Sequence, residues 1–283
     1  MFAQQLRKTP VRLVVLAVGF LAVNALFIGP LSALVKQGNP LVSLLTLVLG
    51  VAAAFAEVWL YRWVIRKVEH REATELASVD VAALRRGTLL GIGMFSVVML
   101  LITIFGGYDS LSWGSFFSVF ATAGMMAAVA VIEEIIFRGI LFRLLEQMTG
   151  TLGAMIGSAV VFGGLHLIND PTAFWGALAI AIQGGLMLAA CYAVTRSLWL
   201  PIGLHFGWNF AESGIFGTTV SGSSNSGSGL FHSVLDGPTL ISGGDFGPEA
   251  TIFAVLVCST LTLHFVRKMT SLSKTEAQEL AVA

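Results

Sequence analysis

Long apolar runs recur along the whole chain and restrict its fold more than any other feature. Of the 283 residues, 56% are hydrophobic and 11% are charged, whereas an ordinary soluble domain has about 25% charged residues. A helix that crosses a bilayer needs about 20 mostly apolar residues. With a mean hydropathy of +0.85, the chain is predicted to be an all-α, polytopic membrane helix bundle of about eight transmembrane helices. The predicted spans are 11–34, 41–61, 88–106, 114–137, 152–168, 173–195, 199–216 and 250–266.

The distribution of Lys and Arg predicts the orientation of these helices. Cytoplasmic loops of membrane proteins carry an excess of both residues. With the N-terminus inside, only Lys36 of the 16 basic residues falls on the outer side. We therefore expect both termini in the cytoplasm and a multi-pass protein of the cell membrane, which the compact architecture suggests is bacterial. The net charge of zero predicts no nucleic-acid partner. The apolar composition makes the lipid bilayer the expected environment.

The same pattern divides the chain into four regions. Residues 1–113 hold the first three helices, with a cytoplasmic connection at 62–87 that is expected to form an interfacial helix or hairpin. Residues 114–216 hold helices four to seven. Residues 217–249 are rich in Gly and Ser and lack Lys and Arg, which predicts an outer loop, flexible or folded back on the rim. Residues 250–283 hold helix eight and a cytoplasmic tail.

An acidic pair, Glu133 and Glu134, interrupts the fourth apolar stretch and is followed by Arg138. A charge at the centre of a transmembrane helix costs on the order of 2.5–3.5 kcal/mol, so it usually faces a cavity or a partner. Glu134 and Arg138 are four residues apart with the acid first, the favourable order for an ion pair on one helix face. Glu133 lies about 100° around the helix. We therefore interpret Glu134 as a structural partner and Glu133 as the carboxylate that is free for a site.

Two further apolar stretches carry pairs of residues one helical turn apart. The pairs are Phe162–His166 in the fifth stretch and His205–Asn209 in the seventh. Glu133 lies 17 residues before Gly150, the predicted turn, and His166 lies 16 residues after it, so the two should reach similar depth. His205 lies closer in sequence to its own cytoplasmic turn, near Ser197. It can therefore share the depth of Glu133 and His166 only if the turn at Gly150 projects further into the cytoplasm.

Each of these residues has a structural interpretation when it is taken singly. A Glu–Arg pair is commonly a packing device, and a membrane Asn can be an interhelical contact worth about 0.6 kcal/mol. Glu57 in the second stretch is expected to snorkel or to pair with an Arg. Together, however, an unneutralised Glu, two His and an Asn at one depth are the groups needed to activate water and to hold an oxyanion.

Three motifs occur in order on separate stretches: E-E-x-x-x-R at 133–138, F-x-x-x-H at 162–166 and H-x-x-x-N at 205–209. With them, residues 114–212 resemble the CPBP family of CAAX prenyl protease-related (Rce1-like) intramembrane proteases. The resemblance implies an endopeptidase that cuts a membrane-associated peptide or protein near the cytoplasmic face. Nothing in the sequence specifies that the substrate is prenylated.

The resemblance also implies roles for single residues. Glu133 with His166 would deprotonate the attacking water, and His205 and Asn209 would donate hydrogen bonds to the oxyanion. Glu133, His166 and His205 could instead hold a zinc ion with water as its fourth ligand. The zinc-protease signature H-E-x-x-H is absent, and the spacing is compatible with zinc and with a metal-free mechanism alike. The remaining motif residues would hold the helices or contact substrate: Glu134, Arg138 and Phe162.

Two other classes of function compete with hydrolysis. The first is a non-catalytic membrane scaffold, or a bacteriocin-immunity (self-protection) protein, in which the polar residues are architectural. The second is a small transporter with Glu133 as a proton carrier. The chain shows no internal repeat and no paired Gly/Pro-broken helices, which are typical of transporters with inverted repeats. For a bacterial member of the family, peptide processing or self-protection against secreted peptides is the expected role.

Overall fold

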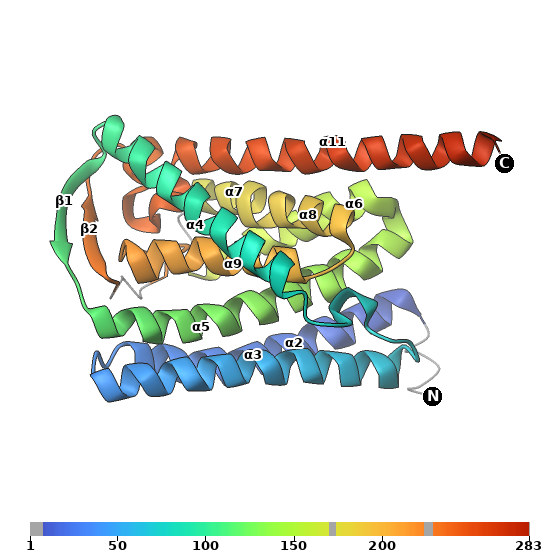
Figure 1. Ribbon diagram of the computed structural model, residues 1–283, viewed down its shortest axis with the longest axis horizontal. Helices are drawn as coiled ribbons and strands as arrows, with labels where there is room; N and C mark the ends of the chain where they lie inside the picture. Colours follow the sequence, from blue (N-terminus) through green and yellow to red (C-terminus); the bar gives the residue numbers. More distant parts are fainter. Residues whose placement is uncertain (1–7, 170–173, 224–228, 283) are drawn as a thin grey trace.

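A helix occupies each of the eight predicted stretches in the computed structural model, which describes residues 8–169, 174–223 and 229–282 (Figure 1). The all-α prediction is therefore confirmed, and a two-stranded sheet lies at one end of the bundle. The helices are α2 (Thr9–Val35), α3 (Pro40–Val68), α4 (Val81–Ile104), α5 (Phe116–Glu134) with the π-helical η2 (Ile135–Phe142), α6 (Arg143–Leu165) with the 3₁₀ turn η3 (His166–Ile168), α7 (Phe174–Ile180) with the π-helical η4 (Ala181–Met187) and α8 (Leu188–Thr195), α9 (Trp199–Asn209) with the π-helical η5 (Phe210–Ile215), and α11 (Ile252–Val282).

Six helices in the described ranges are long and apolar enough to cross a membrane: Thr9–Val35, Pro40–Val68, Val81–Ile104, Phe116–Ile168, Phe174–Thr195 and Ile252–Leu272. Phe116–Ile168 contains both the fourth and the fifth predicted stretch, and its direction reverses at Gly150. Gly150 has φ 76°, a conformation that favours glycine. The seventh stretch, α9 with η5, is shorter than these six. The start of α2 and the end of α11 lie at the same end of the bundle (Figure 1), as an even number of crossings requires.

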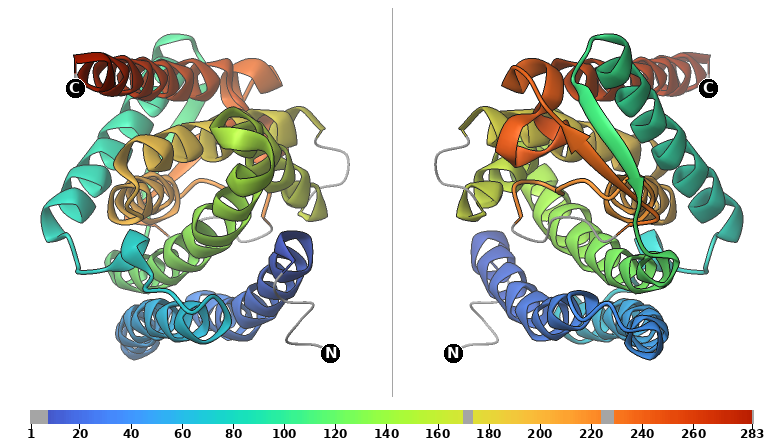
Figure 2. Two further views of the ribbon diagram at one scale, coloured as in Figure 1. Left: turned by 90° about the vertical axis from the view of Figure 1, so that its right-hand side faces the viewer. Right: turned by 90° about the vertical axis from the view of Figure 1, so that its left-hand side faces the viewer.

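Figure 2 shows the helices end-on, with α2 and α3 on one side of α5–α9 and α11 on the opposite side. Glycines allow the closest of these helix contacts. Gly87 and Gly91 of α4 face Gly203 and Gly207 of α9, four residues apart in each helix. A Cβ on Gly207 would lie 2.2 Å from the Thr88 carbonyl oxygen, so only glycine fits there. Two small-xxx-small pairs thus hold α9, the helix of the H-x-x-x-N motif, against α4.

The connection between the second and third spans is shorter than the predicted 62–87. α3 continues to Val68 and α4 begins at Val81, with only the 3₁₀ turn η1 (Thr74–Leu76) between them. The Arg62 Nε donates to the Leu76 carbonyl oxygen at 2.7 Å, which ties this turn to α3. Both helices therefore extend into the predicted connection, because Arg and Lys can continue a helix beyond its apolar run with their charged ends in water.

Residues 217–249, here called the outer segment, are folded wherever the structure describes them, and they pack at one end of the bundle. Strand β2 (Phe231–Leu235) pairs antiparallel with β1 (Tyr108–Trp113), with Trp113 opposite Phe231. A short helix, α10 (Thr239–Ser242), and two 3₁₀ turns, η6 (Gly244–Phe246) and η7 (Pro248–Ala250), lead back into the bundle. Residues 224–228 of the predicted loop lie outside the described residues.

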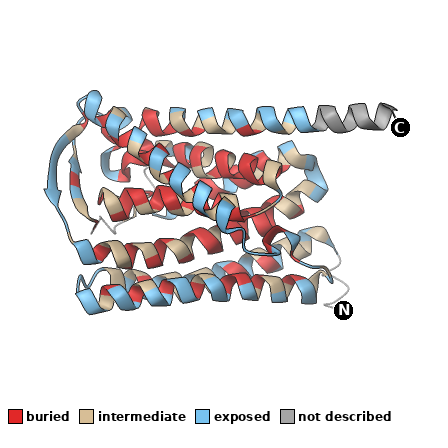
Figure 3. Cartoon of the chain, viewed as in Figure 1, coloured by how far each residue is buried: buried red, intermediate tan, exposed pale blue. Residues whose placement is uncertain are grey.

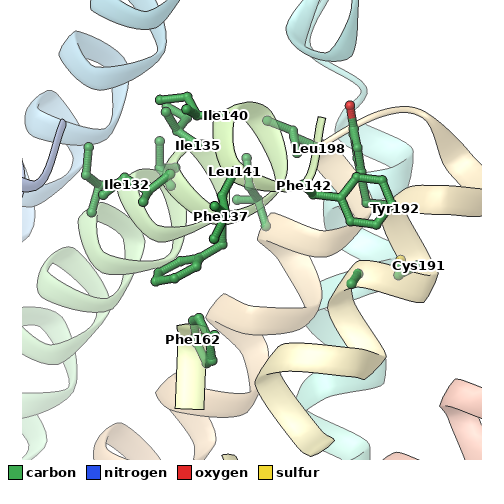
Figure 4. Close-up of a cluster of buried hydrophobic side chains, with 14 of the residues drawn as sticks. Ile132, Ile135, Phe137, Ile140, Leu141, Phe142, Phe162, Cys191, Tyr192 and Leu198 are labelled. Carbon is green, nitrogen blue, oxygen red and sulfur yellow. The ribbon is translucent and has the colours of Figure 1, made fainter. Parts of the chain in front are cut away.

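The hydrophobic core surrounds the π-helical segment η2. Ile132, Ile135, Phe142 and Leu198 are almost completely buried in it, and Phe142 packs edge-on against Tyr192 with ring centroids 5.3 Å apart (Figure 4). In Figure 3 the buried residues gather in the inner helices, while the outer faces of α2, α3 and α11 are exposed. This core fixes the segment directly after the Glu133–Glu134 pair.

Candidate active site

A cavity of about 540 Å³ lies between α2, α5, α6 and α9. Five predicted site residues line it: Glu133, Phe162, His166, His205 and Asn209. Much of the remaining wall is apolar, with Met125, Met187 and Leu204 among its residues. The three motifs therefore place side chains from three separate helical segments at one cavity.

The turn at Gly150 extends beyond the connection between α8 and α9 (Figure 1). This is the projection that His205 needs in order to lie at the same depth as Glu133 and His166. An ion pair joins these two turns. Both terminal nitrogens of Arg196 bind the Glu146 carboxylate, at 2.6 and 2.9 Å. This two-point contact links the start of α6 to the connection that precedes α9.

Glu134 and Arg138 form the predicted ion pair, with Nη1 of Arg138 2.6 Å from Oε1 of Glu134 and both side chains buried. The guanidinium also donates to the carbonyl oxygens of Gly184 and Gly185 in η4, the latter at 3.1 Å. Glu134 has a second partner that the sequence did not reveal, because its Oε1 lies 3.0 Å from Nδ1 of His205. Glu134 therefore connects α5 with α9 as well as with Arg138.

Glu133 points into the cavity with 23% of its side chain exposed and forms no hydrogen bond with any described residue. Nε2 of His205 lies 3.8 Å from its Oε2, and the two form an ion pair when the imidazole is protonated. Glu133 and His166 line the same cavity without forming an ion pair or a hydrogen bond in the described structure. Both side chains therefore border the same cavity.

The hydrogen bonds of His166 fix its proton. Its Nδ1 lies 2.8 Å from the Phe162 carbonyl oxygen, four residues earlier. A carbonyl oxygen can only accept, so Nδ1 carries the hydrogen and Nε2 of the neutral ring keeps its lone pair. Nε2 is thus available as a base or as a ligand.

Phe162 lies among three of the polar groups. Its ring centroid is 4.8 Å from that of His166 and 6.3 Å from that of His205, and the Arg138 guanidinium carbon lies 5.1 Å from it. At these distances the ring packs against both imidazoles and forms a cation–π contact with Arg138. Phe162 therefore sets the spacing of the polar groups around it.

Asn209 lies one turn after His205 on α9 and is mostly buried at the cavity wall. Its carboxamide has no hydrogen-bond partner among the described residues. An amide NH₂ can donate two hydrogen bonds. Asn209 therefore offers unused donors to a molecule in the cavity.

Three π-helical segments adjoin the site: η2 follows Glu134, η4 contains the carbonyl groups that bind Arg138, and η5 follows Asn209. π-helical turns are rare and occur frequently at functional sites. Each one rotates the residues after it relative to a regular α-helix. For this reason the orientation of the side chains that follow could not be predicted from a 3.6-residue period.

The predicted zinc ligands do not fit a metal site in this arrangement. Within residues 8–169, 174–223 and 229–282, no group of three or more His, Cys, Asp or Glu side chains could hold a metal ion. We therefore derive no step through a metal.

Several cavity residues were missed by the sequence analysis, namely Gln183, Trp208, Ser221 and Glu249. Gln183 gives a detectable signal as the one strongly polar residue in an apolar stretch, whereas nothing in the sequence connects position 249 with the site.

Two other acids are fully buried, and neither carboxyl group has a hydrogen-bond partner among the described residues: Glu57 and Glu212. The expectation that Glu57 snorkels or pairs with an Arg was wrong. Glu57 lies on the buried face of α3, where the adjoining helices leave no room for it to reach water.

Residues 113–211 match the model of a protein family described as type II CAAX prenyl endopeptidase Rce1-like. No curated protein and no solved structure matches the chain significantly. The matched range begins just before α5 and ends in η5, so it contains all three motifs and the helices that carry them. Over residues 113–211, the chain is therefore similar to the Rce1-like family of CAAX prenyl endopeptidases.

Proposed function

We propose that the protein hydrolyses peptide bonds of membrane-associated substrates with a water activated by Glu133 and His166. The observation that carries the proposal is the convergence of Glu133, His166, His205 and Asn209 on one cavity. A carboxylate without a hydrogen bond and an imidazole with a free Nε2 face the same space. These are the two acceptors needed to orient a water and to remove its proton.

In the proposed reaction, the water donates hydrogen bonds to Glu133 and to Nε2 of His166, and its oxygen attacks the scissile carbonyl carbon. Glu133 takes the proton and returns it to the leaving amine. Asn209 donates from its amide to the oxyanion that forms on the carbonyl oxygen. Loss of one such donor costs about 10²–10³ in kcat in other hydrolases.

His205 has a separate role, which its two neighbours define. Its Nδ1 donates to Glu134, and its Nε2 faces Glu133 at 3.8 Å. When both ring nitrogens are protonated, Nε2–H can donate to the oxyanion. Glu134 and Arg138 then act as positioning residues, because they orient His205 and do not touch the reacting atoms.

We place the basic end of the bundle in the cytoplasm, as the positive-inside rule predicts. The cavity wall extends from Glu133 to Lys36 and Ser223, near the end that carries the β1–β2 sheet. A substrate that reaches Glu133 from this end therefore passes the outer segment.

The test uses purified full-length protein in lipid nanodiscs and two quenched fluorescent peptides. Both end in Cys-aliphatic-aliphatic-X, and only one carries a farnesyl group on its cysteine. We expect cleavage of at least one peptide by the unmodified protein and none above background by Glu133→Gln or His166→Ala. Glu72→Gln is the control, because Glu72 is exposed and its carboxylate pairs with Arg66. Equal cleavage by Glu133→Gln would contradict the proposal, and cleavage that chelation abolishes and zinc restores would contradict its metal-free form.

A further inference from the structure

Glu249 forms the centre of a buried hydrogen-bond cluster outside the matched family core. It lies in η7, at the end of the outer segment, and only 4% of it is exposed. Its Oε1 accepts from the indole nitrogen of Trp208 at 2.9 Å. Its Oε2 accepts from the backbone nitrogen and the hydroxyl of Ser221, at 2.9 and 2.6 Å. Three hydrogen-bond donors thus compensate the cost of burying one carboxylate, because a buried charge is costly unless it is paired or hydrogen-bonded.

The cluster links the two elements that carry the imidazoles of the site. Trp208 lies on α9 directly before Asn209 and one turn after His205. On the other side, the Ser221 carbonyl oxygen accepts from Nδ2 of Asn169 at 2.9 Å, three residues after His166. The path Trp208–Glu249–Ser221–Asn169, here called the Glu249 clasp, therefore spans from the His205 helix to the His166 turn.

A third element joins through the backbone of Glu249. Its carbonyl oxygen accepts from Nε2 of Gln183 in η4 at 2.7 Å. Gln183 directly precedes Gly184 and Gly185, whose carbonyl oxygens bind Arg138. The clasp is therefore connected to the same π-helical segment that holds the Glu134–Arg138 pair.

All four clasp residues also line the cavity. The geometry points to Glu249 as a positioning residue for hydrolysis: through Trp208 and Ser221 it fixes the distance between the His166 turn and the helix of His205 and Asn209. This inference rests on the proposed function. A displacement of catalytic groups by about 1 Å can lower a rate by about 100-fold, so a residue that fixes this distance affects kcat even though it does not touch the reacting atoms.

A purely structural role would lower stability and leave the kinetics of the folded enzyme unchanged. Glu249→Gln distinguishes the two roles because it keeps the shape of the side chain. An amide cannot accept at both ends, so it must lose either the Trp208 bond or the Ser221 bonds. Ser221→Ala is a milder second variant that removes only the hydroxyl donor. Ser233→Ala is the matched control, because Ser233 is a buried serine of the outer segment that donates to the Phe216 carbonyl oxygen away from the cavity.

The experiment measures kcat, KM and thermal unfolding of these variants in nanodiscs with whichever of the two peptides is cleaved. We expect Glu249→Gln to lower kcat by about 10- to 100-fold with little change in KM, and Ser221→Ala to lower it less. Trp208→Phe combined with Glu249→Gln should be no slower than the slower single variant, because both break the same link. Ser233→Ala should keep the unmodified kcat.

Three outcomes overturn the inference, and they separate its failure from that of the proposed function. If the unmodified protein cleaves and Glu249→Gln folds and cleaves equally fast, Glu249 does not position the site and the proposed function stands. If the effects of Trp208→Phe and Glu249→Gln multiply, the two residues do not act through one link. If the unmodified protein cleaves neither peptide, the proposed function fails and the inference fails with it.

Discussion

The inner and outer helices of this bundle are similarly apolar in sequence but differ in what surrounds them. In the most apolar windows of Phe116–Ile168 and Phe174–Thr195, 67% of the residues are buried within the protein. The buried share is only 11% in Thr9–Val35 and 28% in Ile252–Leu272, and Figure 3 shows the same contrast. The outer helices present their apolar faces to lipid, and the inner ones pack against other helices. Hydropathy alone therefore identifies helices that can span a membrane, but it does not show which of them form the interior.

The polar residues at the cavity show which helices form the interior. The buried ion pair, the two cavity imidazoles and the three π-helical segments all lie in α5–α9 and their extensions. In a bilayer, a polar side chain is retained where protein or a cavity surrounds it. The same substitution should therefore have a large effect in the inner helices and a small one in the outer helices, and the following predictions test this contrast.

The largest contrast is expected for asparagine. Asn209→Ala removes the unused donor at the cavity and should lower kcat by about 10²–10³-fold while the fold stays intact. Asn24→Ala makes the same change in the outer helix α2, away from the cavity, and should leave kcat unchanged. Cleavage of the fluorescent peptides in nanodiscs measures both. Equal kcat values for the two variants would show that Asn209 does not take part in the reaction.

Ion pairs provide the second contrast. Glu134→Gln leaves the buried Arg138 without its countercharge and should lower the free energy of unfolding by about 3–5 kcal/mol. Glu72→Gln breaks the exposed pair with Arg66 and should cost less than about 1 kcal/mol. Chemical unfolding in mixed micelles compares them. A cost for Glu134→Gln as small as that for Glu72→Gln would show that the inner pair is not held in a low-dielectric interior.

Two glycines of α4 give the third contrast within one helix. Gly91 faces α9, where a Cβ would lie 2.4 Å from the Leu204 carbonyl oxygen, so Gly91→Ala should cost about 1–3 kcal/mol. Gly93 has no heavy atom within 4 Å of such a Cβ, so Gly93→Ala should stabilise the helix by about 0.5–1 kcal/mol. Thermal unfolding of the two variants measures both changes in stability. A stabilised Gly91→Ala would contradict the close contact of α4 with α9.

The smallest effect concerns the turn between α3 and α4, outside the spans. Burial raises the pKa of Glu75, but hydrogen bonds from Arg71 and Tyr61 outweigh burial and lower that pKa below its ordinary value of 4.5. The pKa is lower in the folded state, so this contribution to stability is present above about pH 4.5 and is lost as the pH falls through the folded-state pKa. The protection factors of the amide hydrogens in residues 69–80 should therefore fall at acid pH. Glu75→Gln should weaken this dependence, and an unchanged acid response in that variant would assign it to another group such as Glu69, whose pKa is also lowered because hydrogen bonds from Arg143 and Arg71 outweigh its burial.

The sequence was sufficient to predict which polar side chains share a helix face, because these residues repeat at helical spacing. Glu134 and Arg138, or His205 and Asn209, share a helix face because four residues make about one turn. The sequence could not show that Glu134 also binds His205, since this contact depends on the relative rotation of two helices and on the π-helical segments. Glu249 was missed because no periodicity connects an acid in the outer segment to Trp208 on α9.

The central claim is that Glu133 and His166, which lie on separate helices, act on the same water. A double-substitution measurement tests it most directly: kcat of Glu133→Gln, of His166→Ala and of the double variant, each with the cleaved fluorescent peptide and each shown to be folded. Residues that act as one unit are not additive in their effects. The account predicts that each single variant loses most of the activity and that the double variant is no slower than the slower single one. Losses that multiply in the double variant, or a single variant with unchanged kcat, would contradict it.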